Sequence, residues 1–280
     1  MKIGPYRVHT LETGHFALDG GAMFGVIPKT LWSKQHPADE RNRIALALRV
    51  LLLVSDEKVI LIDTGIGDKF APKHQEMYAI DQSSNSLSSA LAAQNLAPAD
   101  ITDVILTHLH FDHAGGATVL RDGQAVPAFS NALYHVQRRN WDWAQSQNER
   151  DRASYLKENF EPLMDHGQLR LLEGDGEILP GISAWLSDGH TIGQQLIKVS
   201  DIQQALVYCA DIIPTASHLG LPFIMGYDLQ PLLTMEEKRR LLQQAADSDW
   251  IIVFEHDPLM AACRVRHGAK GVELAEAITF

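Results

Sequence analysis

A run of metal-binding side chains that follows an apolar strand limits what this chain can fold into more than any other feature. The run is Thr107-His108-Leu109-His110-Phe111-Asp112-His113, and the apolar, β-branched residues 101–106 precede it. Because residues two apart in an extended segment point the same way, His108 and His110 can bind one ion together. Asp112 and His113 come where the strand should have ended, so a turn there can present a second cluster. A polar loop that happens to hold three histidines is disfavoured, since crowded imidazoles repel when protonated and need partners when buried.

The composition is that of an ordinary globular protein, with 280 residues, 45% hydrophobic and 21% charged. A chain of this length can build its core without disulfides. The two cysteines, Cys209 and Cys263, are expected to be buried free thiols. Near the histidine run no thiolate is present to specify a structural zinc site, whereas imidazole and carboxylate suit zinc, iron or manganese.

Charge and hydropathy exclude several classes of protein. The formal net charge is -11, from 24 basic and 35 acidic side chains, and no dense run of Lys or Arg occurs. Nucleic acid is therefore not expected as a partner, because its binding depends on neutralising phosphates. The longest apolar stretch, Ile44 to Val54, contains Arg49 and is too short to cross a bilayer. The N-terminus has no signal-peptide pattern, so we expect a cytoplasmic protein with no membrane partner.

Apolar patterning predicts an α/β (α+β) protein in which two sheets pack face to face with helices outside. We expect one domain, residues 1–280, with an N-terminal loop extension (about 14–40) and a helical insertion (about 137–166). Helices are predicted at Ser86–Asn95 and Met235–Ala246. Strands are predicted at 6–13, 44–54, 59–62, 101–106, 132–136, 169–172, 182–186, 195–199, 205–210 and 250–254.

Three further strand-end residues can complete a metal site. Two ions need about seven or eight protein ligands if water is to keep a position. His190, Asp211 and His256 each follow an apolar strand. The predicted partition places His108, His110 and His190 on the first ion and Asp112, His113 and His256 on the second, with Asp211 bridging both. Taken singly, each histidine could be a hydrogen-bonded loop residue, and Asp211 could cap a helix that begins near Ile213.

The pattern H-x-H-x-D-H followed by His, Asp and His resembles that of the metallo-β-lactamase superfamily of binuclear hydrolases. Asp63-Thr64-Gly65 is similar to the first motif of that family, in which the acidic residue supports the metal loops from behind. The resemblance covers residues 59–257 and implies a four-layer αββα sandwich with the metal site at one edge of the sheets. It also implies two divalent ions, with zinc as first choice and iron, manganese or cobalt as alternatives.

Within the superfamily, the chain is similar to quorum-quenching N-acyl homoserine lactonases of the YtnP type, with methyl parathion hydrolase as a more distant relative. The similar segments are residues 18–32, 155–160 and 210–215. One position departs from the better-known acyl homoserine lactonases, which place a Tyr three residues after the bridging Asp. Here that position is Pro214, so we expect His218 or Tyr227 to replace the Tyr, or the natural substrate not to be a lactone.

The segment from Asp19 to Trp32 is rich in Gly and carries Met23, Phe24 and Trp32. One interpretation makes these three residues, together with Tyr227, substrate-binding side chains in a pocket wall. Exposed apolar side chains would also leave a homodimer open as an option. The alternative is a core-filling loop. The aromatic residues Trp141, Trp143, Tyr155 and Phe160 carry the same two interpretations.

The resemblance and the residues together predict a metallo-hydrolase that opens a lactone or carboxylic ester of a small-molecule substrate. A hydroxide bridging the two ions would attack the carbonyl, with Asp112, Asp211 and His218 as the catalytic side chains and Asp211 moving a proton to the leaving alkoxide. An arylesterase or phosphotriesterase similar to methyl parathion hydrolase is the alternative enzyme. A metal-binding, non-catalytic or redox protein is the alternative from a different class.

Overall fold

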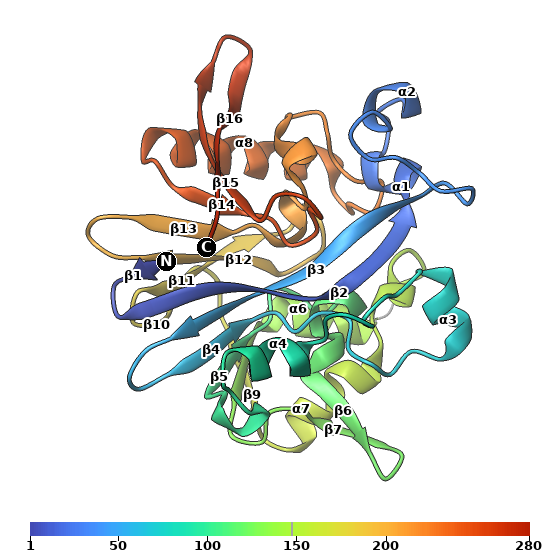
Figure 1. The fold of residues 1–280 in the computed structure, drawn as a ribbon, viewed down its shortest axis with the longest axis vertical. Helices are drawn as coiled ribbons and strands as arrows, with labels where there is room; N and C mark the ends of the chain where they lie inside the picture. Colours follow the sequence, from blue (N-terminus) through green and yellow to red (C-terminus); the bar gives the residue numbers. More distant parts are fainter. Residues whose placement is uncertain (147) are drawn as a thin grey trace.

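Two seven-stranded sheets form the centre of the molecule, which we describe from a computed structural model for residues 1–146 and 148–280 (Figure 1). The first sheet has the order β1-β2-β3-β4-β5-β8-β9, and the second runs from β10 to β16 in chain order. A separate two-stranded sheet, β6-β7, lies outside both.

The strands of the first sheet are β1 (Lys2–Ile3), β2 (Tyr6–Asp19), β3 (Arg43–Val54), β4 (Val59–Ile62), β5 (Asp103–Ile105), β8 (Leu133–Gln137) and β9 (Leu169–Leu172). Those of the second are β10 (Gly176–Leu179), β11 (Ile182–Ser187), β12 (Gln194–Ser200), β13 (Ala205–Tyr208), β14 (Ile251–Val253), β15 (Ala262–Gly268) and β16 (Gly271–Ile278). The small sheet pairs β6 (Thr118–Arg121) with β7 (Gln124–Pro127). The α-helices are α1 (Gly20–Phe24), α2 (Lys29–Trp32), α3 (Pro72–Met77), α4 (Leu87–Ala93), α5 (Phe111–Ala114), α6 (Arg138–Ser146), α7 (Glu161–Asp165) and α8 (Pro231–Asp247).

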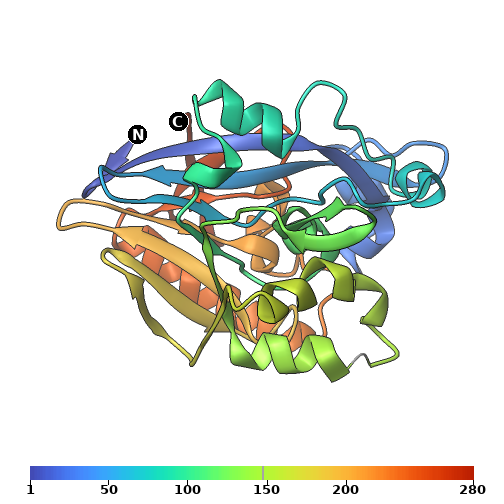
Figure 2. The ribbon, with the colours of Figure 1, turned by 90° about the horizontal axis from the view of Figure 1, so that it is seen from below.

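Successive side chains of the central strands point to opposite faces of their sheet, and both faces are covered. The molecule therefore has four layers (Figure 2). In β3, Leu51 and Leu53 face the core between the two sheets, whereas Val50 and Leu52 face the cluster under α4, α6 and α7. The second sheet does the same, because Leu206 of β13 faces the inner core and Val207 packs in the cluster that includes residues of α8. A strand that is buried on both faces is apolar at nearly every position. For this reason residues 44–54 show no alternation of apolar and polar residues. The predicted αββα arrangement is confirmed.

Parallel pairing brings the functional loops to one edge. β4, β5 and β8 run parallel to one another, and β13 runs parallel to β14. The carboxyl ends of parallel strands lie at the same edge of a sheet, so the loops that follow them meet there. These loops begin at Asp63 after β4, at Leu106 after β5, at Cys209 after β13 and at Phe254 after β14.

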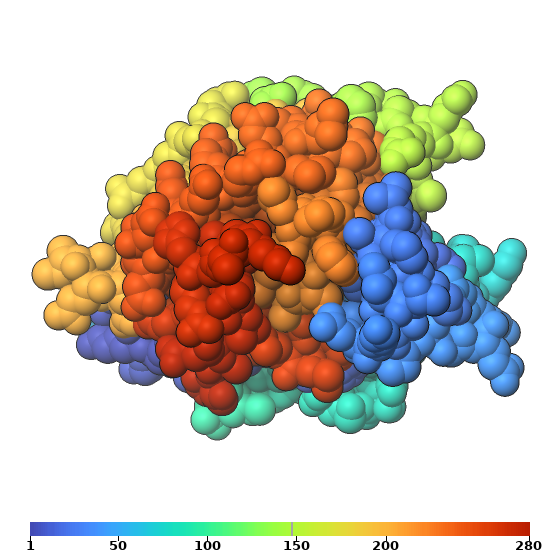
Figure 3. Space-filling view, turned by 90° about the horizontal axis from the view of Figure 1, so that it is seen from above, coloured from blue at the N-terminus to red at the C-terminus, as the bar shows by residue number. Residues whose placement is uncertain are grey.

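The N-terminal extension is more regular than the predicted loop. β2 continues through residues 14–19 and pairs with β3 as far as Asp19, and α1 and α2 follow it. Asp19 caps α1 by accepting a hydrogen bond from the Ala22 N–H at 2.8 Å. Seen from above, α1 and α2 lie beside the segment near residues 210–230 (Figure 3), and the Gly226 N–H donates to Ala22 O at 2.7 Å.

The structure also shows the predicted helical insertion and a C-terminal hairpin that was not predicted. The insertion contains α6 and α7 as well as short 3-10 turns at Arg152–Ser154 and Lys157–Asn159, while Gln147 lies outside the described residues. The C-terminal hairpin β15-β16 is absent from the prediction, and β16 is exposed along most of its length, so it has little core-facing apolar pattern to detect. Among the described residues, no helix combines the length and the apolar composition that crossing a bilayer requires.

Candidate metal centre

Seven side chains from four loops, those after β5, β11, β13 and β14, converge at one edge of the sheets. They form one group of four and one group of three, and within each group the ligand atoms lie within 4.8 Å of one another. The first group is His108, His110, His190 and Asp211, and the second is Asp112, His113 and His256. All seven residues predicted as ligands therefore lie in these two groups, and each has at most 7% of its surface exposed.

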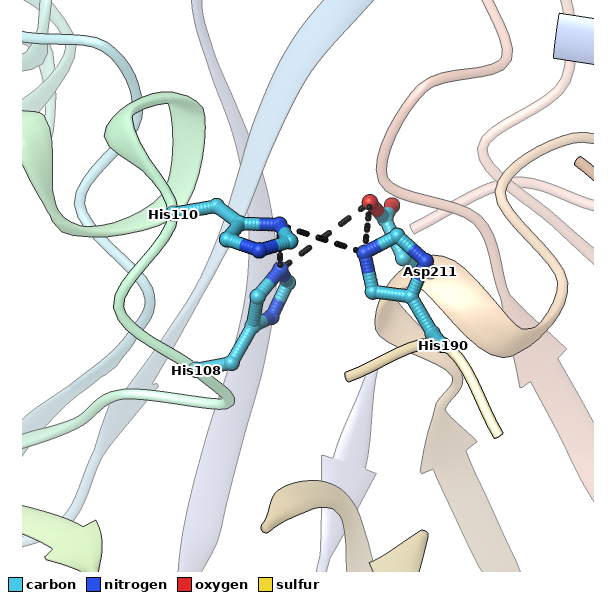
Figure 4. Close-up of side chains that lie close together, drawn as sticks. All are labelled: His108, His110, His190 and Asp211. Carbon is cyan, nitrogen blue, oxygen red and sulfur yellow. Dashed lines mark hydrogen bonds and ion pairs between the residues drawn. The ribbon is translucent and has the colours of Figure 1, made fainter. Parts of the chain in front are cut away.

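The first group is compact (Figure 4). His110 Nδ1 lies 3.0 Å from His108 Nε2 and 3.2 Å from His190 Nε2. Asp211 Oδ2 lies 3.1 Å from His190 Nε2 and 4.0 Å from His108 Nε2. His108 and His110 come from the end of one extended segment, as the two-residue spacing predicts. Three imidazole nitrogens and one carboxylate oxygen thus face a common point.

The second group lies on the other side of Asp211. His256 Nε2 is 3.4 Å from His113 Nε2 and 3.7 Å from Asp112 Oδ2, and His113 Nε2 is 3.9 Å from Asp112 Oδ2. Asp211 reaches this group as well, with Oδ1 3.1 Å from His256 Nε2 and Oδ2 3.5 Å from His113 Nε2. Its two oxygens therefore face both groups.

Hydrogen bonds on the outer side of the rings fix where the lone pairs point. His190 Nδ1–H donates to Asp228 Oδ1 at 2.9 Å, and His256 Nδ1–H donates to Ala47 O at 2.9 Å. Asp63 Oδ2 lies 3.0 Å from His113 Nδ1 and accepts the Thr107 hydroxyl at 2.6 Å. Because the outer nitrogen of each ring is engaged in this way, the inward nitrogen is the one directed at the site and can bind a metal ion.

The local charge favours a cation. Burial, together with the neighbouring His113, His110 and His190, holds the pKa of His108 well below its usual range, and burial does the same for His110. Burial alone would lower the pKa of His256, but Asp211 and Glu255 outweigh it and raise that pKa to about 9. Carboxylates likewise raise the pKa of His113 against the effect of burial. The carboxylates around His113 and His256 therefore stabilise positive charge inside the site, as a proton or as a metal ion.

These observations fit divalent metal. Bare imidazole nitrogens 3.0 to 3.4 Å apart repel unless a cation or a proton lies between them. The donor set of five imidazoles and two carboxylates, without thiolate, suits zinc, iron or manganese. His108, His110, His190 and Asp211 would hold one ion, and Asp112, His113 and His256 would take part in holding another.

The loop that begins at Asp63 and the turn that follows the histidine run are packed backbone against backbone. Asp63 adopts φ +59°, a left-handed conformation that an acidic residue tolerates in tight turns. A Cβ atom on Gly115 would collide with the backbone of Ile66, so the turn after the histidine run packs directly against the Asp63 loop. The Thr64 N–H and hydroxyl both donate to His113 O, each at 2.8 Å. The position predicted for Asp63, behind the metal loops, agrees with these contacts.

Two residues that contact the metal-site histidines are not among those predicted from the sequence. Glu255 Oε2 lies 2.9 Å from His113 Nδ1, and Asp228 pairs with His190. Glu255 precedes the predicted ligand His256 in the sequence, and this position is a weak signal of its role. Asp228 is 38 residues from His190 and has no local signal, because tertiary packing alone brings it there.

A cavity of about 370 Å³ opens over the metal groups. Its polar floor includes His110, Asp112, His190, Asp211 and His256. The remaining lining residues are Leu18, Met23, Tyr78, Phe111, Arg150, Asp151, Ala153, Ser154, Met225, Gly226 and Tyr227. A small, mostly apolar ligand with one polar group directed at the floor suits this shape.

The cavity separates the predicted substrate contacts into two sets. Met23 and Tyr227 line it, in agreement with the pocket-wall interpretation. Phe24 and Trp32 do not line it, being 0% and 2% exposed and stacked on each other with ring centroids 5.6 Å apart. Their placement supports the core-filling alternative for these two residues.

His218 also lies away from the cavity, contrary to the catalytic role predicted for it. Its Nε2–H donates to Met23 O at 2.8 Å, the Thr215 hydroxyl pairs with its Nδ1 at 2.8 Å, and its ring stacks on Phe24. The side chain is 0% exposed. Both ring nitrogens are used inside the fold, so His218 holds the cavity wall together instead of reaching a substrate.

The aromatic residues of the insertion mostly pack in the core. Phe160 and Tyr155 are 0% and 2% exposed, and Trp141 and Trp143 pack against the same cluster. Tyr155 lies edge-on to His110 with ring centroids 4.7 Å apart, so it supports a metal-site ring.

Four layers, a ligand-bearing edge and the matching residues together define the class of this protein. Residues 49–256 match the family model for the metallo-beta-lactamase superfamily, and the chain belongs to that superfamily. Among curated relatives, an N-acyl homoserine lactonase of Bacillus cereus is 29% identical over 230 residues, which cover 77% of this chain and 83% of the relative. N-acyl homoserine lactonase AiiA of Bacillus thuringiensis subsp. kurstaki is 30% identical over 234 residues, covering 76% and 83%.

Solved structures agree with the fold. A probable metal-dependent hydrolase from Staphylococcus aureus is 34% identical, with a TM-score of 0.90 and coverage of 100% of this chain and 99% of that one. AidC, a dizinc quorum-quenching lactonase solved with a product, has a TM-score of 0.81 at 21% identity, covering 100% and 97%. At this level of identity the second likeness shows the fold alone.

Proposed function

We propose that this protein is a metal-dependent hydrolase that opens lactones, with N-acyl homoserine lactones as its substrate class. The observation that carries the proposal is the position of Asp211 between two groups of metal-binding side chains at the floor of a mainly apolar cavity. The curated relatives in the same superfamily are N-acyl homoserine lactonases, which supports this substrate class over phosphotriesters and over a redox or non-catalytic role.

We assign two divalent ions, with zinc as first choice, to the two groups of ligands. Ions held there would supply two kinds of chemistry, lowering the pKa of a water molecule and polarising the carbonyl of the substrate. His108, His110 and His190 serve the first position, and Asp112, His113 and His256 serve the second. Asp211 lies between the two groups, with one oxygen 3.1 Å from His190 Nε2 and the other 3.1 Å from His256 Nε2, and would take part in holding both ions.

Asp211 is also our candidate for moving a proton. Ring opening breaks the bond between the carbonyl carbon and the ring oxygen, and the departing oxygen needs a proton to leave as an alcohol. The carboxylate of Asp211 lines the cavity floor, so an oxygen of this group can take a proton from the attacking water and pass it to the leaving oxygen. No serine or cysteine nucleophile is needed in this scheme.

Tyr227 is the candidate for the hydrogen bond that Pro214 cannot make. The Pro214 carbonyl accepts the His256 N–H at 3.0 Å, and proline has no side-chain donor. Tyr227 lines the cavity and is 39% exposed. Burial, followed by the charges of Asp19 and Asp112, raises its pKa, so the phenol keeps its proton and can donate to a substrate carbonyl. The alkyl or acyl part of the substrate then lies against Met23, Phe111 and Met225.

A hydrolysis panel on protein of known metal content tests the proposal. The panel contains acyl homoserine lactones of different chain lengths, simple lactones, aryl esters and a phosphotriester, and the proton released on ring opening is followed. We expect the acyl homoserine lactones to give the highest kcat/KM and the removal of metal by a chelator to abolish turnover. A fully metal-loaded protein that turns over the phosphotriester fastest, or no substrate at all, would contradict the proposal.

A further inference from the structure

Arg150 lines the cavity over the metal groups and is a cation without a carboxylate partner in the described part of the chain. It follows α6 in the helical insertion. Its neighbour Asp151 is engaged elsewhere, because Asp151 Oδ2 accepts the Trp143 Nε1–H at 2.8 Å and Oδ1 accepts a hydrogen bond from the Asn148 amide. The positive charge of Arg150 is therefore available to a ligand that enters the cavity.

Two backbone carbonyls hold the guanidinium against the cavity wall. Arg150 Nη2 donates to Gly226 O at 2.8 Å and to Asp228 O at 3.2 Å. These two carbonyls flank Tyr227, the residue proposed to donate to the reacting carbonyl. From the other side, the Gly226 N–H donates to Ala22 O at 2.7 Å. The guanidinium of Arg150 and the phenol of Tyr227 thus belong to one hydrogen-bonded part of the wall.

The remaining donors of the guanidinium are unused. The group is planar and presents five N–H donors in a fixed fork, so the two bonds from Nη2 also fix the direction of the other nitrogens. Between residues 1 and 146 and between 148 and 280, neither Nε nor Nη1 has an acceptor. Donors that are held in place before a ligand arrives cost little to order, so they favour the binding of an acceptor oxygen.

The proposed substrate class offers two acceptor oxygens. An N-acyl homoserine lactone has the lactone carbonyl and, next to the ring, the amide carbonyl of the acyl group, whereas a simple lactone has only the first. The metal groups and Tyr227 would serve the lactone carbonyl, which leaves Arg150 for the second oxygen. An amide that enters a cavity without a donor loses its hydrogen bonds to water, so a donor at this position favours the substrate that carries the amide.

We infer that Arg150 is a specificity-determining residue, whose guanidinium donates to the amide oxygen of the acyl group and so selects acylated lactones over simple lactones. The inference rests on the proposed lactonase function and concerns the choice among lactones. It gives the two donors of the wall separate roles: Tyr227 serves the carbonyl that reacts, and Arg150 serves the carbonyl that does not.

The test compares two lactones in the wild type and in Arg150→Met, which keeps an unbranched side chain and removes the donors. One lactone is N-hexanoyl homoserine lactone, and the other is a butyrolactone with an alkyl chain of equal length on the same ring carbon. We expect the ratio of their kcat/KM values, acylated over alkyl, to fall by about 3- to 10-fold in Arg150→Met. Any loosening of Tyr227 affects both lactones, so the ratio isolates the contact with the amide.

An inhibitor and two further variants complete the comparison. N-Cyclopentylhexanamide carries the amide and no lactone, so its inhibition constant should rise by about 3- to 10-fold in Arg150→Met without any change in the chemical step. Arg152→Met is the matched control, because Arg152 stands two residues away and does not line the cavity. Tyr227→Phe should lower kcat/KM for both lactones and leave their ratio unchanged. Elemental analysis should find the same zinc content in all of these proteins.

The results separate this inference from the proposed function. A wild type that prefers the acylated lactone, together with an Arg150→Met variant that keeps the same ratio and the same inhibition constant, overturns the inference alone. Equal losses on both lactones would reduce Arg150 to a support for Tyr227 and also overturn it. A metal-loaded wild type that hydrolyses the alkyl lactone at least as well as the acylated one, or hydrolyses neither, contradicts the proposed substrate class and with it the basis of the inference.

Discussion

Asp228 Oδ1 lies 2.9 Å from His190 Nδ1, with the two side chains 1% and 2% exposed. The other oxygen of the same carboxylate accepts the Met225 N–H at 3.1 Å. One buried carboxylate therefore orients a metal-site ring and holds the loop that carries Met225 and Tyr227 into the cavity wall. The shape of the cavity and the geometry of the metal site are coupled through this residue.

Asp228→Ala should reduce both metal affinity and turnover. Removal of the carboxylate frees the His190 ring and releases the loop, so we expect about a 10- to 100-fold loss in metal affinity or kcat/KM. Zn²⁺ competition and lactone hydrolysis measure the two effects. Asp151→Ala is the matched control, because Asp151 also lines the cavity but pairs with Trp143 Nε1 at 2.8 Å instead of a metal-site ring. Equal losses of metal affinity in both variants would contradict the role of Asp228.

His108→Ala and His110→Ala should lose metal and activity together. Each variant removes one of the imidazole nitrogens that face the common point of the first group. Elemental analysis of the dialysed proteins, alongside hydrolysis rates, checks this. His267→Ala serves as the control, since its ring on β15 is exposed, belongs to neither group of ligands and pairs with Asp247 at the end of α8. Full turnover in His108→Ala would refute the assignment of the first group.

The predictability of the metal ligands has a physical cause. His108, Asp211 and His256 each follow a run of apolar, β-branched residues, and such a run marks a buried strand whatever its partners are. β4, with the sequence VILI and turn residues on both sides, matches its predicted bounds for the same reason. Once several strands of one sheet end in ligands, parallel pairing brings the ligands together.

Other features depend on information that a local pattern does not contain. The residue types of Phe24 and Trp32 show that they are apolar, but the core cluster in which they pack draws on segments far apart in the sequence, such as those of Phe16, Ile44 and Met225. β16 was missed because an exposed edge strand has little apolar alternation to detect. The pairing of Glu255 with His113 depends on how β14 lies beside β13 and on the loop after β5, and its one signal in the sequence is that Glu255 precedes His256.

Tyr227→Phe should lower turnover without loss of metal. The variant removes the phenol proposed to donate to the substrate carbonyl, and it keeps the ring that forms the cavity wall. A lost hydrogen bond to the developing oxyanion corresponds to about a 10- to 100-fold fall in kcat/KM. Tyr78→Phe is the control, since Tyr78 lines the same cavity without a proposed role. If Tyr227→Phe keeps the wild-type kcat/KM, the proposed hydrogen bond is wrong.

His218→Ala should cost stability and leave metal content unchanged. The ring is buried, it bonds to Met23 O and Thr215 Oγ1, and it stacks on Phe24 with centroids 4.7 Å apart. Removing it leaves a buried carbonyl and a cavity, for which a loss of about 2–4 kcal/mol in the free energy of unfolding is typical. Urea unfolding and elemental analysis measure the two quantities. An unchanged unfolding free energy with a large fall in kcat would return His218 to the catalytic role.

The contribution of His218 to stability should also depend on pH. Burial lowers its pKa to about 3, with the nearby charges of Lys238 and His36 acting in the same direction. The pKa of the folded state is therefore below the unfolded value of about 6.5, so this stabilising contribution is fully present above pH 6.5 and is lost as the pH falls toward 3. In that window the unfolded chain binds a proton that the folded protein does not, which costs up to about 1.4 kcal/mol per pH unit. The difference in unfolding free energy between wild type and His218→Ala, measured on metal-free protein in urea at several pH values, should shrink steadily below pH 6.5. A difference that stays constant down to pH 4 would show that the buried ring takes up a proton as readily in the folded protein as in the unfolded chain.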